Sequence, residues 1–449
     1  MAQDPDQAKK LQELLKMLSL SQNDASKLTQ PQRKQFEEYK FWKTQPVPRF
    51  DDEVEDEGPI NSSQRPENIP NEPLPLLSEF EWCTVDITDP HQLEDVFVLL
   101  NENYVEDQDA TFRFNYSREF FNWSLKPPGW RKDWHVGVRT RQSKRLVAFI
   151  SAVPATLRVR TKLVKSVEIN FLCIHKKLRS KRLTPILIKE VTRRVNKQDI
   201  WQALYTAGVV LPSPAATCRY AHRPLNWSKL YEVGFTGLPA NASKTQMIAK
   251  YTLPKEIDTP GLRPLEEKDL DEVYDLLEKY QSRFDLVQVF TKEEFRHLLL
   301  SSTSVVYSYV VESNNKITDF VSFYSLPFTV LNNPHYKELG IGYLFYYASD
   351  ADFDYSDRYD SEGSLKLKKR LNRLISDVCI KARDLKMDVF NAMSCQDNSL
   401  FLDDLKFGPG DGFLNFYLFN YRVRPILGGL RKDNSFDAEK RSNVGVVML

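Results

Sequence analysis

The spacing of apolar residues along the chain predicts the same set of elements twice. Leu93, Val96, Leu99 and Leu100 have the spacing of one face of a helix, and the same spacing begins again at Leu270. The second set continues with Val273, Leu276 and Leu277. A helix with one apolar face must bury that face against other elements, so each set predicts a packed unit.

Two further patterns follow each of these helices in the same order. A strand, a polar turn and a second strand are predicted in HVGVRTRQSKRLVAFISAVP (135–154) and in SYVVESNNKITDFVSFYSLP (308–327). A basic segment, a helix and a short strand are predicted from residue 179 and again from residue 366. Three matches in one order indicate an internal duplication. We therefore predict an α/β fold with two related halves, residues 36–254 and 255–449.

Two segments before residue 79 lack the apolar pattern of a packed core. Residues 1–35 are polar, which predicts a mobile N-terminal arm with a short, transient helix around its leucines. Residues 50–75 are acidic and then rich in Pro, Asn and Ser. This composition predicts an extended connector that covers the compact fold.

Composition and charge narrow the possible functions. Among 449 residues there are 62 Lys and Arg against 61 Asp and Glu, so no overall field attracts nucleic acid or an anionic membrane. Five cysteines without a CxxC pair are typical of a reducing, cytoplasmic compartment. Six histidines with no HExxH motif predict no metal site. No segment approaches the ~18 apolar residues of a membrane span.

A basic loop is the strongest chemical signal in the chain. The apolar strand in VEINFLCIHKK runs into Arg179, Lys181 and Arg182, and Pro185 is expected at the first position of the following helix. Unpaired N–H groups and the helix dipole make such a loop an anion cradle, which predicts a phosphate-rich ligand. A merely solvated basic loop is the alternative.

Familiar catalytic motifs are absent from the sequence. There is no GxSxG and no Walker loop, and the Gly-rich run FGPGDG (407–412) is most simply a turn. Cys173 lies within the apolar strand, where a buried thiol is ordinary packing. No covalent nucleophile is therefore identified.

Five separated blocks resemble one enzyme family. They are YKFWKTQPVP from Tyr39, EINFLCIHKKLRSKRL from Glu168, TAGVVLP from Thr206, LKFGPGDG from Leu405, and the terminal GVVML. Together they resemble glycylpeptide N-tetradecanoyltransferases, the N-myristoyltransferase family, and most closely its fungal members. The resemblance implies a duplicated acetyltransferase-like (GNAT) fold, with central mixed sheets flanked by helices. It also implies transfer of myristate from myristoyl-CoA to an N-terminal glycine.

The resemblance assigns acyl-CoA binding to the N-terminal half. Backbone N–H groups and side chains of the basic loop would hold the CoA phosphates, since several converging donors suit a diphosphate. The implied residues are Tyr39, Lys40, Phe41, Trp42, Leu172, Cys173, Ile174, Arg179, Ser180, Lys181, Arg182, Leu183 and Thr184. Myristoyl-CoA is then a substrate, and no permanently bound cofactor is expected.

The implied chemistry needs no covalent relay. The backbone amides of Phe171 and Leu172 would form an oxyanion hole, and Asn170 and Thr206 would lie at the glycine amine. The carboxylate of Leu449 would be the general base. GVVML is apolar and has high β-propensity, so we expect a buried C-terminal strand, and burial would raise the pKa of a carboxylate and make it a better base.

The implied peptide site joins acidic and aromatic residues. Carboxylates would meet lysines near the start of the substrate, and Gln108 stands where many relatives carry another acid. The implied residues are Tyr104, Glu106, Asp107, Asp109, Phe112, Phe114, Gly208, Tyr220, His222 and Asp411. A tunnel lined by backbone would reject any first residue that carries a Cβ atom.

Two other functions remain open at this point. One is an acetyl-CoA-dependent acetyltransferase, and the other is a duplicated module that binds acyl-CoA without catalysis. We also expect a monomer without nucleic-acid partners, and the family resemblance implies ribosome contact through the lysines of the N-terminal arm.

Overall fold

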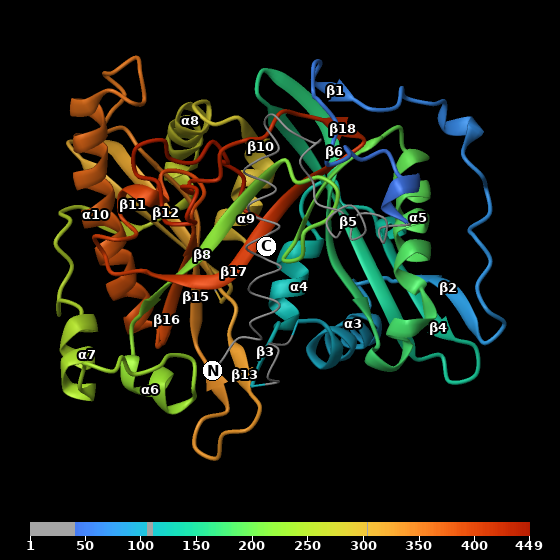
Figure 1. The fold of residues 1–449 in the computed structure, drawn as a ribbon, viewed down its shortest axis with the longest axis horizontal. Helices are drawn as coiled ribbons and strands as arrows, with labels where there is room; N and C mark the ends of the chain where they lie inside the picture. The colour runs from blue at the N-terminus through green and yellow to red at the C-terminus, as the bar shows by residue number, and fades with distance from the viewer. Residues whose placement is uncertain (1–40, 106–110, 303) are drawn as a thin grey trace.

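The computed structural model describes residues 41–105, 111–302 and 304–449 (Figure 1). The predicted arm, residues 1–35, lies outside the described residues, together with its short helix and its lysines. From Phe80 onward, helices and strands alternate in an α/β arrangement, which confirms the predicted fold class.

The first half contains the following elements in chain order. They are β2 (Phe80–Thr84), α3 (Pro90–Asn103), β3 (Phe112–Phe114), α4 (Arg118–Leu125), β4 (His135–Thr140), β5 (Leu146–Val159), β6 (Lys162–Ile174), α5 (Leu183–Asn196), β7 (Gln202–Ala207) and β8 (Ala216–Pro224).

The second half repeats this order. Its corresponding elements are β9 (Leu262–Pro264), α8 (Leu270–Gln281), β10 (Leu286–Val289), α9 (Lys292–Leu300), β11 (Val306–Ser313), β12 (Lys316–Ser325), β15 (Ile341–Ser349), α10 (Ser361–Asp384), β16 (Val389–Met393) and β17 (Gly408–Phe419). The shorter elements are α6 (Trp227–Glu232), α7 (Lys244–Tyr251), β1 (Gly58–Pro59), β13 (Phe328–Val330), β14 (Glu338–Leu339) and β18 (Tyr421–Arg422).

The two halves form one sheet by exchanging a strand. The order is β2-β4-β5-β6-β7-β17-β8-β16-β15-β12-β11-β9, so β17 of the second half lies between β7 and β8 of the first. In the same way, β8 pairs with β16 of the second half. The crossovers β6 to β7 and β15 to β16 are the parallel pairs at matching places in the two halves. The exchange joins the halves along the middle of the sheet.

A second exchange occurs at the ends of the long strands. β10 of the second half pairs with residues 156–159 of β5, and β3 of the first half pairs with β13, which follows β12. Helices α5 and α10 lie at opposite sides of the molecule (Figure 1). Each connects a parallel strand pair, as the duplicated basic segments predicted.

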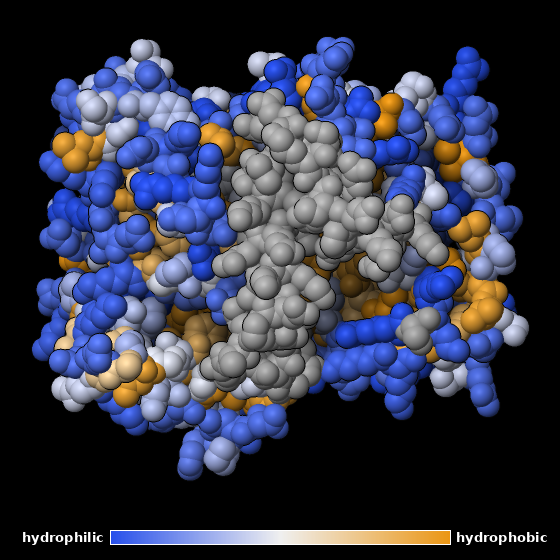
Figure 2. Space-filling view, in the orientation of Figure 1, coloured by the Kyte–Doolittle hydropathy of each residue, from blue (hydrophilic) through white to orange (hydrophobic). Residues whose placement is uncertain are grey.

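The predicted helical faces are buried. Leu93, Val96, Leu99 and Leu100 of α3 are in the core, and so are Val273, Leu276 and Leu277 of α8. Residue Leu270 is only partly buried at the start of its helix. On the face shown in Figure 2, hydrophilic residues dominate, and hydrophobic residues form small separate patches. No helix in the described ranges is both long and apolar enough to cross a membrane.

Residues 50–75 form an extended connector over the outside of the fold, as predicted (Figure 1). The guanidinium of Arg193 on α5 holds it by donating to the carbonyl oxygens of Pro70 and Asn71, at 3.0 and 2.9 Å. Trp82 donates its indole N–H to Leu74 O at 2.8 Å. The connector therefore follows α5 because the polar face of that helix supplies donors.

Two local predictions were wrong. FGPGDG is not a turn, because Gly408 begins β17 and the run forms the irregular start of this strand, with a register shift between Pro409 and Phe413. Pro185 is the third residue of α5 and not the first, since the helix begins at Leu183. A proline is tolerated there because N–H groups in the first turn have no partner within the helix.

Candidate active site

A β-bulge interrupts β6 at the centre of the sheet. Phe149 pairs with Cys173 and Ser151 with Asn170, so Ile150 of β5 faces the two residues Phe171 and Leu172. The backbone of Phe171 is left-handed, with φ of 57°, although the residue is buried and is not glycine. A bulge leaves an extra residue outside the regular ladder, and strained residues of this kind cluster at functional sites.

The basic loop follows directly after this strand. Residues Lys176–Lys181 form a 3₁₀ turn, and Arg182, also left-handed with φ of 56°, precedes α5. No side chain caps the N-terminus of α5, so its first N–H groups point toward the loop without a side-chain acceptor. Lys181, Arg182 and Thr184 are exposed, whereas Arg179 donates to the carbonyl oxygen of Asn103. This geometry suits an anion.

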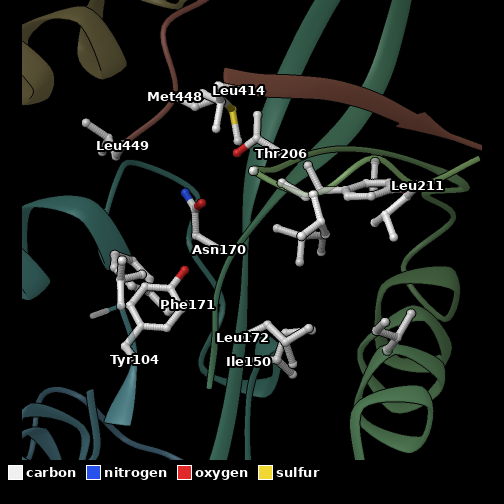
Figure 3. A pocket seen from close by; sticks show the side chains of 18 of the residues that line it. Tyr104, Ile150, Asn170, Phe171, Leu172, Thr206, Leu211, Leu414, Met448 and Leu449 are labelled. Atoms are coloured by element: carbon white, nitrogen blue, oxygen red, sulfur yellow. The ribbon is translucent and has the colours of Figure 1, made fainter. Parts of the chain in front are cut away.

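A cavity of about 720 Å³ opens beside the bulge and extends in two directions (Figure 3). One end lies between α5 and the sheet and is lined by aliphatic side chains. These are Ile150, Val167, Ile169, Leu172, Ile188, Val191, Val195 and Ile200. This end is an apolar slot along α5.

The other end of the cavity, which we call the aromatic groove, lies between the two halves and is lined mainly by aromatic side chains. These are Tyr104, Phe114, Tyr116, Tyr220, Phe235, Tyr324, Phe328 and Tyr343, with His222 and Asn391. His222 and Asn391 join their side chains across β8 and β16 at 2.7 Å, and burial lowers the pKa of His222. The two ends meet at Asn170, Phe171, Thr206 and Leu449.

The C-terminal segment reaches this junction from the second half. Val446, Val447 and Met448 are buried, and Met448 and Leu449 line the cavity (Figure 3). The segment is buried, as predicted, but it is not a regular strand, because it has only isolated β-bridges, from Ser442 to Gly428 and from Val444 to Leu286. Hydrogen bonds to the rest of the fold hold its backbone. Gly445 N and Val446 N donate to Leu286 O at 2.8 and 3.1 Å, Gln396 N donates to Val444 O at 2.7 Å, and Val447 N donates to the Tyr346 hydroxyl at 3.1 Å.

A buried ionic cluster fixes the start of the same segment. Asp397 accepts from Arg358 at 2.7 Å, lies 3.1 Å from Arg441 and is 3.8 Å from Arg283. Arg358 also donates to the carbonyl oxygen of Ser442 at 3.2 Å. Burial opposes ionisation of Asp397, but the three guanidinium groups hold its pKa at about 2. The cluster therefore stays charged and anchors the tail eight residues before Leu449.

Polar groups at the junction face one another. The Asn170 oxygen and the Thr206 hydroxyl point toward the same space below Met448 (Figure 3). The Asn170 amide donates to the buried carboxylate of Glu168 on the same strand. Burial raises the pKa of Tyr104, so this hydroxyl stays protonated where it meets the backbone of Phe171. Burial also raises the pKa of Cys173 to about 12, which disfavours the thiolate that a nucleophile requires.

The predicted binding residues differ in their relation to the cavity. Gly208 lies on its wall, whereas Phe112 packs on Phe235 and Phe328 outside the lining. Asp411 is exposed at the start of β17, near Arg219 and His222. Ile174 and Leu183 are buried in the core under α5. Glu106, Asp107, Asp109, Tyr39 and Lys40 lie outside the described residues, as does the side chain of Ser180.

Trp42 borders the cavity from the N-terminal segment that follows Phe41. Its ring stacks on Tyr205 of β7, with ring centres 5.6 Å apart, and Tyr205 stacks on Tyr417 of β17 at 5.0 Å. The Tyr417 hydroxyl accepts from Leu211 N at 2.7 Å and donates to Val209 O at 3.1 Å. The stack therefore links the segment that carries Trp42, at the edge of the slot, to the loop that carries Val209 and Leu211, beside the junction.

Sequence reasoning missed several residues that the fold brings to the site. The inner face of α5, with Ile188, Val191 and Val195, lines the slot, and its apolar spacing was a usable signal for this. Tyr324 and Tyr343 come from strands of the second half, and no local pattern marks them as cavity residues. Among the described residues, no cluster of three or more His, Cys, Asp or Glu is arranged to hold a metal ion.

An apolar slot, a basic loop at its edge and a bulged backbone at its end together suit an acyl-transferring enzyme. Two family models match the chain: Myristoyl-CoA:protein N-myristoyltransferase, N-terminal domain, over residues 59–218, and the C-terminal domain of the same family over residues 232–447. The chain therefore belongs to the myristoyl-CoA:protein N-myristoyltransferase family.

Individual relatives match this chain over nearly its whole length. The chain is 72% identical to the glycylpeptide N-tetradecanoyltransferase of Eremothecium gossypii, covering 99% of this chain and 100% of the relative. It is 64% identical to that of Saccharomyces cerevisiae, with the same coverage. A crystal structure of the S. cerevisiae N-myristoyltransferase with bound myristoyl-CoA superposes with a TM-score of 0.92 at 63% identity, covering 99% of this chain and all of the other.

Proposed function

We propose that this chain transfers myristate from myristoyl-CoA to the N-terminal glycine amine of protein substrates. The observation that carries the proposal is the meeting of the slot and the aromatic groove at one junction, beside the bulge of β6. The relative from S. cerevisiae, with which the chain shares its fold, was crystallised with bound myristoyl-CoA. A donor and an acceptor can therefore approach from opposite ends of the cavity.

The acyl donor occupies the first half in this proposal. The fatty chain lies in the slot along α5, where aliphatic walls replace water. The phosphates of CoA lie on Lys181, Arg182, Thr184 and the uncapped N-terminus of α5, with Trp42 over the edge of the slot. Such binding brings the thioester carbonyl to the bulge.

The bulge acts as the oxyanion hole. The amides of Phe171 and Leu172 donate to the thioester oxygen, on which negative charge grows during attack. The left-handed backbone of Phe171 supports this role, because it turns the peptide group out of the direction of the ladder. The side chains of both residues pack in the apolar surroundings, so their contribution to the reaction is through the backbone.

The C-terminal carboxylate of Leu449 is the general base. The glycine ammonium gives one proton to this carboxylate, and the amine nitrogen then attacks the thioester carbon between Asn170 and Thr206. A C–N bond forms and a tetrahedral intermediate collapses with cleavage of the C–S bond. The leaving CoA thiolate takes up the second amine proton and departs as the thiol, while the first proton stays on the Leu449 carboxyl until it passes to water, so atoms and charges balance. The hydrogen bonds along the tail support the role, since a base must be held in position.

Substrate choice follows from the walls of the junction. The amine must pass between Gly208, Leu414 and Leu449, and a Cβ on the first residue would enter this space. The exposed carboxylate of Asp411 attracts a basic side chain further along the peptide. The aromatic groove then holds the backbone between the two halves.

The test uses purified full-length protein, myristoyl-CoA and an octapeptide beginning Gly-x-x-x-Ser. Release of free thiol is followed beside a matched Gly→Ala peptide. The proposal expects release with the glycine peptide and none above background with the alanine peptide. Binding of myristoyl-CoA without thiol release from either peptide would instead favour a non-catalytic acyl-CoA-binding module. Equal turnover of acetyl-CoA would favour an acetyltransferase.

A further inference from the structure

Glu168 is a buried acid behind the junction that the proposed mechanism does not use. It lies on β6 with only 7% of its surface exposed, and it is absent from the cavity lining. Among the residues that the structure describes, no Lys, Arg or His forms an ion pair with it, and its hydrogen-bond partner is the Asn170 amide. A buried carboxylate without a cation is costly, so its presence calls for a functional reason.

We propose that Glu168 is a positioning residue for acyl transfer, which acts by fixing the orientation of the Asn170 amide. The inference rests on the proposed function, because it needs Asn170 at the substrate amine. An ionised Glu168 can only accept hydrogen bonds, so it selects the orientation in which Asn170 Nδ2 points backward. Asn170 Oδ1 is then presented to the junction.

This orientation suits the chemistry of the acceptor. A glycine ammonium or amine carries N–H groups and needs acceptors around it, and Asn170 Oδ1 supplies one beside the Thr206 hydroxyl (Figure 3). With Glu168 protonated, its O–H can donate to Oδ1, so the amide turns and presents Nδ2–H to the amine instead. The N–H groups of Asn170 and of the amine would then face each other, and the amine would no longer be held at the thioester.

The surroundings make Glu168 sensitive to the charge beside it. Val153 and Leu204 pair with it on the neighbouring strands, and within the described residues the hydroxyls of Tyr324 and Tyr346 are titratable groups that its charge affects. Burial raises the pKa of Glu168 to about 7, and the bond from Asn170 counteracts this only in part. A substrate ammonium and the Leu449 carboxylate share the adjacent cavity and have opposite effects on this pKa.

The first experiment reads the hydrogen bond without activity. The ¹⁵N resonance of the Asn170 side-chain amide is followed from pH 5 to 9 in selectively Asn-labelled full-length protein. The inference expects this resonance to titrate with a midpoint near pH 7 and to lose this titration in Glu168→Gln. A resonance that is independent of pH in the unsubstituted protein overturns it.

The second experiment is a double-mutant cycle on kcat with the glycine octapeptide at saturating myristoyl-CoA. Glu168→Gln is expected to lower kcat about tenfold with little change in acyl-CoA affinity, as for loss of one charge-assisted hydrogen bond. In an Asn170→Ala background the same change is expected to lower kcat less than about twofold, because the group that it orients is gone. Equal effects in both backgrounds overturn the inference.

The melting temperature of Glu168→Gln distinguishes a positioning role of Glu168 from a structural one. Ionised Glu168 carries a burial cost that appears above its unfolded pKa and is complete above its folded pKa, so Glu168→Gln should raise Tm more at pH 8 than at pH 5. The matched control is Glu190→Gln, since Glu190 is also buried but is paired with Arg193 and Arg194. That variant should lower Tm. An inactive unsubstituted enzyme would defeat the proposed function, whereas a Glu168→Gln variant that is less stable at pH 8 defeats only this inference.

Discussion

Each half of the molecule carries a β-bulge at the matching place in its sheet, and the bulge of the first half lines the cavity described above. In the first half, Ile150 faces Phe171 and Leu172, and in the second, Ser322 faces Phe345 and Tyr346. The Ser322 hydroxyl accepts from Tyr346 N at 3.2 Å and donates to Tyr346 O at 2.7 Å. An isoleucine side chain can do neither. The second half thus closes its bulge internally, while the first keeps an apolar residue at the matching place.

The loops that follow the two bulged strands, β6 and β15, also differ between the halves. The loop between β6 and α5 points Lys181 and Arg182 outward, whereas the loop between β15 and α10 is acidic and turns Arg358 inward onto Asp397. In that loop Asp352 binds Arg283 at 2.7 Å. The first loop is free to meet an anionic ligand, and the second anchors the C-terminal tail. On the proposed function, the first half of the duplicated fold forms the donor site and the second half positions the base.

The largest effect is expected when the first bulge receives the serine that stands at the matching place in the second. Ile150→Ser is expected to lower kcat about 100-fold, the loss seen when one oxyanion donor is removed elsewhere, because the new hydroxyl competes for the Leu172 amide. Myristoyl-CoA affinity should change little. Pre-steady-state thiol release measures the rate, and calorimetry measures the affinity. Ser322→Ala serves as the control, with an unchanged rate; an unaltered rate in Ile150→Ser would mean that the bulge amides are not used.

Removing the charge that anchors the tail should affect stability. Asp397→Asn is expected to lower the free energy of unfolding at pH 7 by about 2 kcal/mol, since a pKa of about 2 against 3.8 corresponds to a linkage of that order. Because this pKa is lowered, the contribution is present above pH 3.8 and is lost as the pH falls through 2. Urea unfolding at pH 7 and pH 3 should show the deficit shrinking. A constant deficit would assign the effect to packing.

The loops provide the smallest expected effect. Reversing two exposed charges, Lys181→Glu with Arg182→Glu, should weaken myristoyl-CoA binding at least about tenfold, in line with loss of exposed charge-assisted contacts to phosphate. Asp354→Lys in the acidic loop is the matched control and should leave affinity unchanged. Calorimetric titration at two salt concentrations measures the affinity of both variants. The difference in affinity between the double variant and the unsubstituted protein should diminish at high salt. Equal affinities for all three proteins would contradict the assignment of the loop.

The duplication was predictable because each half needs its own apolar faces, and these recur at Leu93 and Leu270. The exchange of β8 and β17 was not, since strand order depends on pairing between segments about 200 residues apart in sequence rather than on local pattern. The bulge was hidden for a related reason. FLCI (171–174) has the continuous apolar character of a buried strand, and nothing in it marks a left-handed Phe171.

The candidate site was predictable where residues act through local geometry. The basic loop before α5 could be predicted as a candidate anion site from the sequence alone, whereas Asn170, Thr206 and Leu449 were assigned by resemblance to a family. Their meeting depends on the tail crossing from the second half, which no periodicity encodes. Glu168 lies in a block that resembles the family, but the sequence gives it no role, because its burial and its hydrogen-bond partner are properties of the fold.

The central claim is that the second half supplies the base through the carboxylate of Leu449. The most direct test adds one glycine after Leu449 and measures single-turnover thiol release with the glycine octapeptide, together with myristoyl-CoA affinity. The account predicts that the rate falls at least about 100-fold while affinity stays within twofold, because general-base catalysis of this kind contributes 10²–10⁴-fold. A rate equal to that of the unextended protein, with the same affinity, would contradict it.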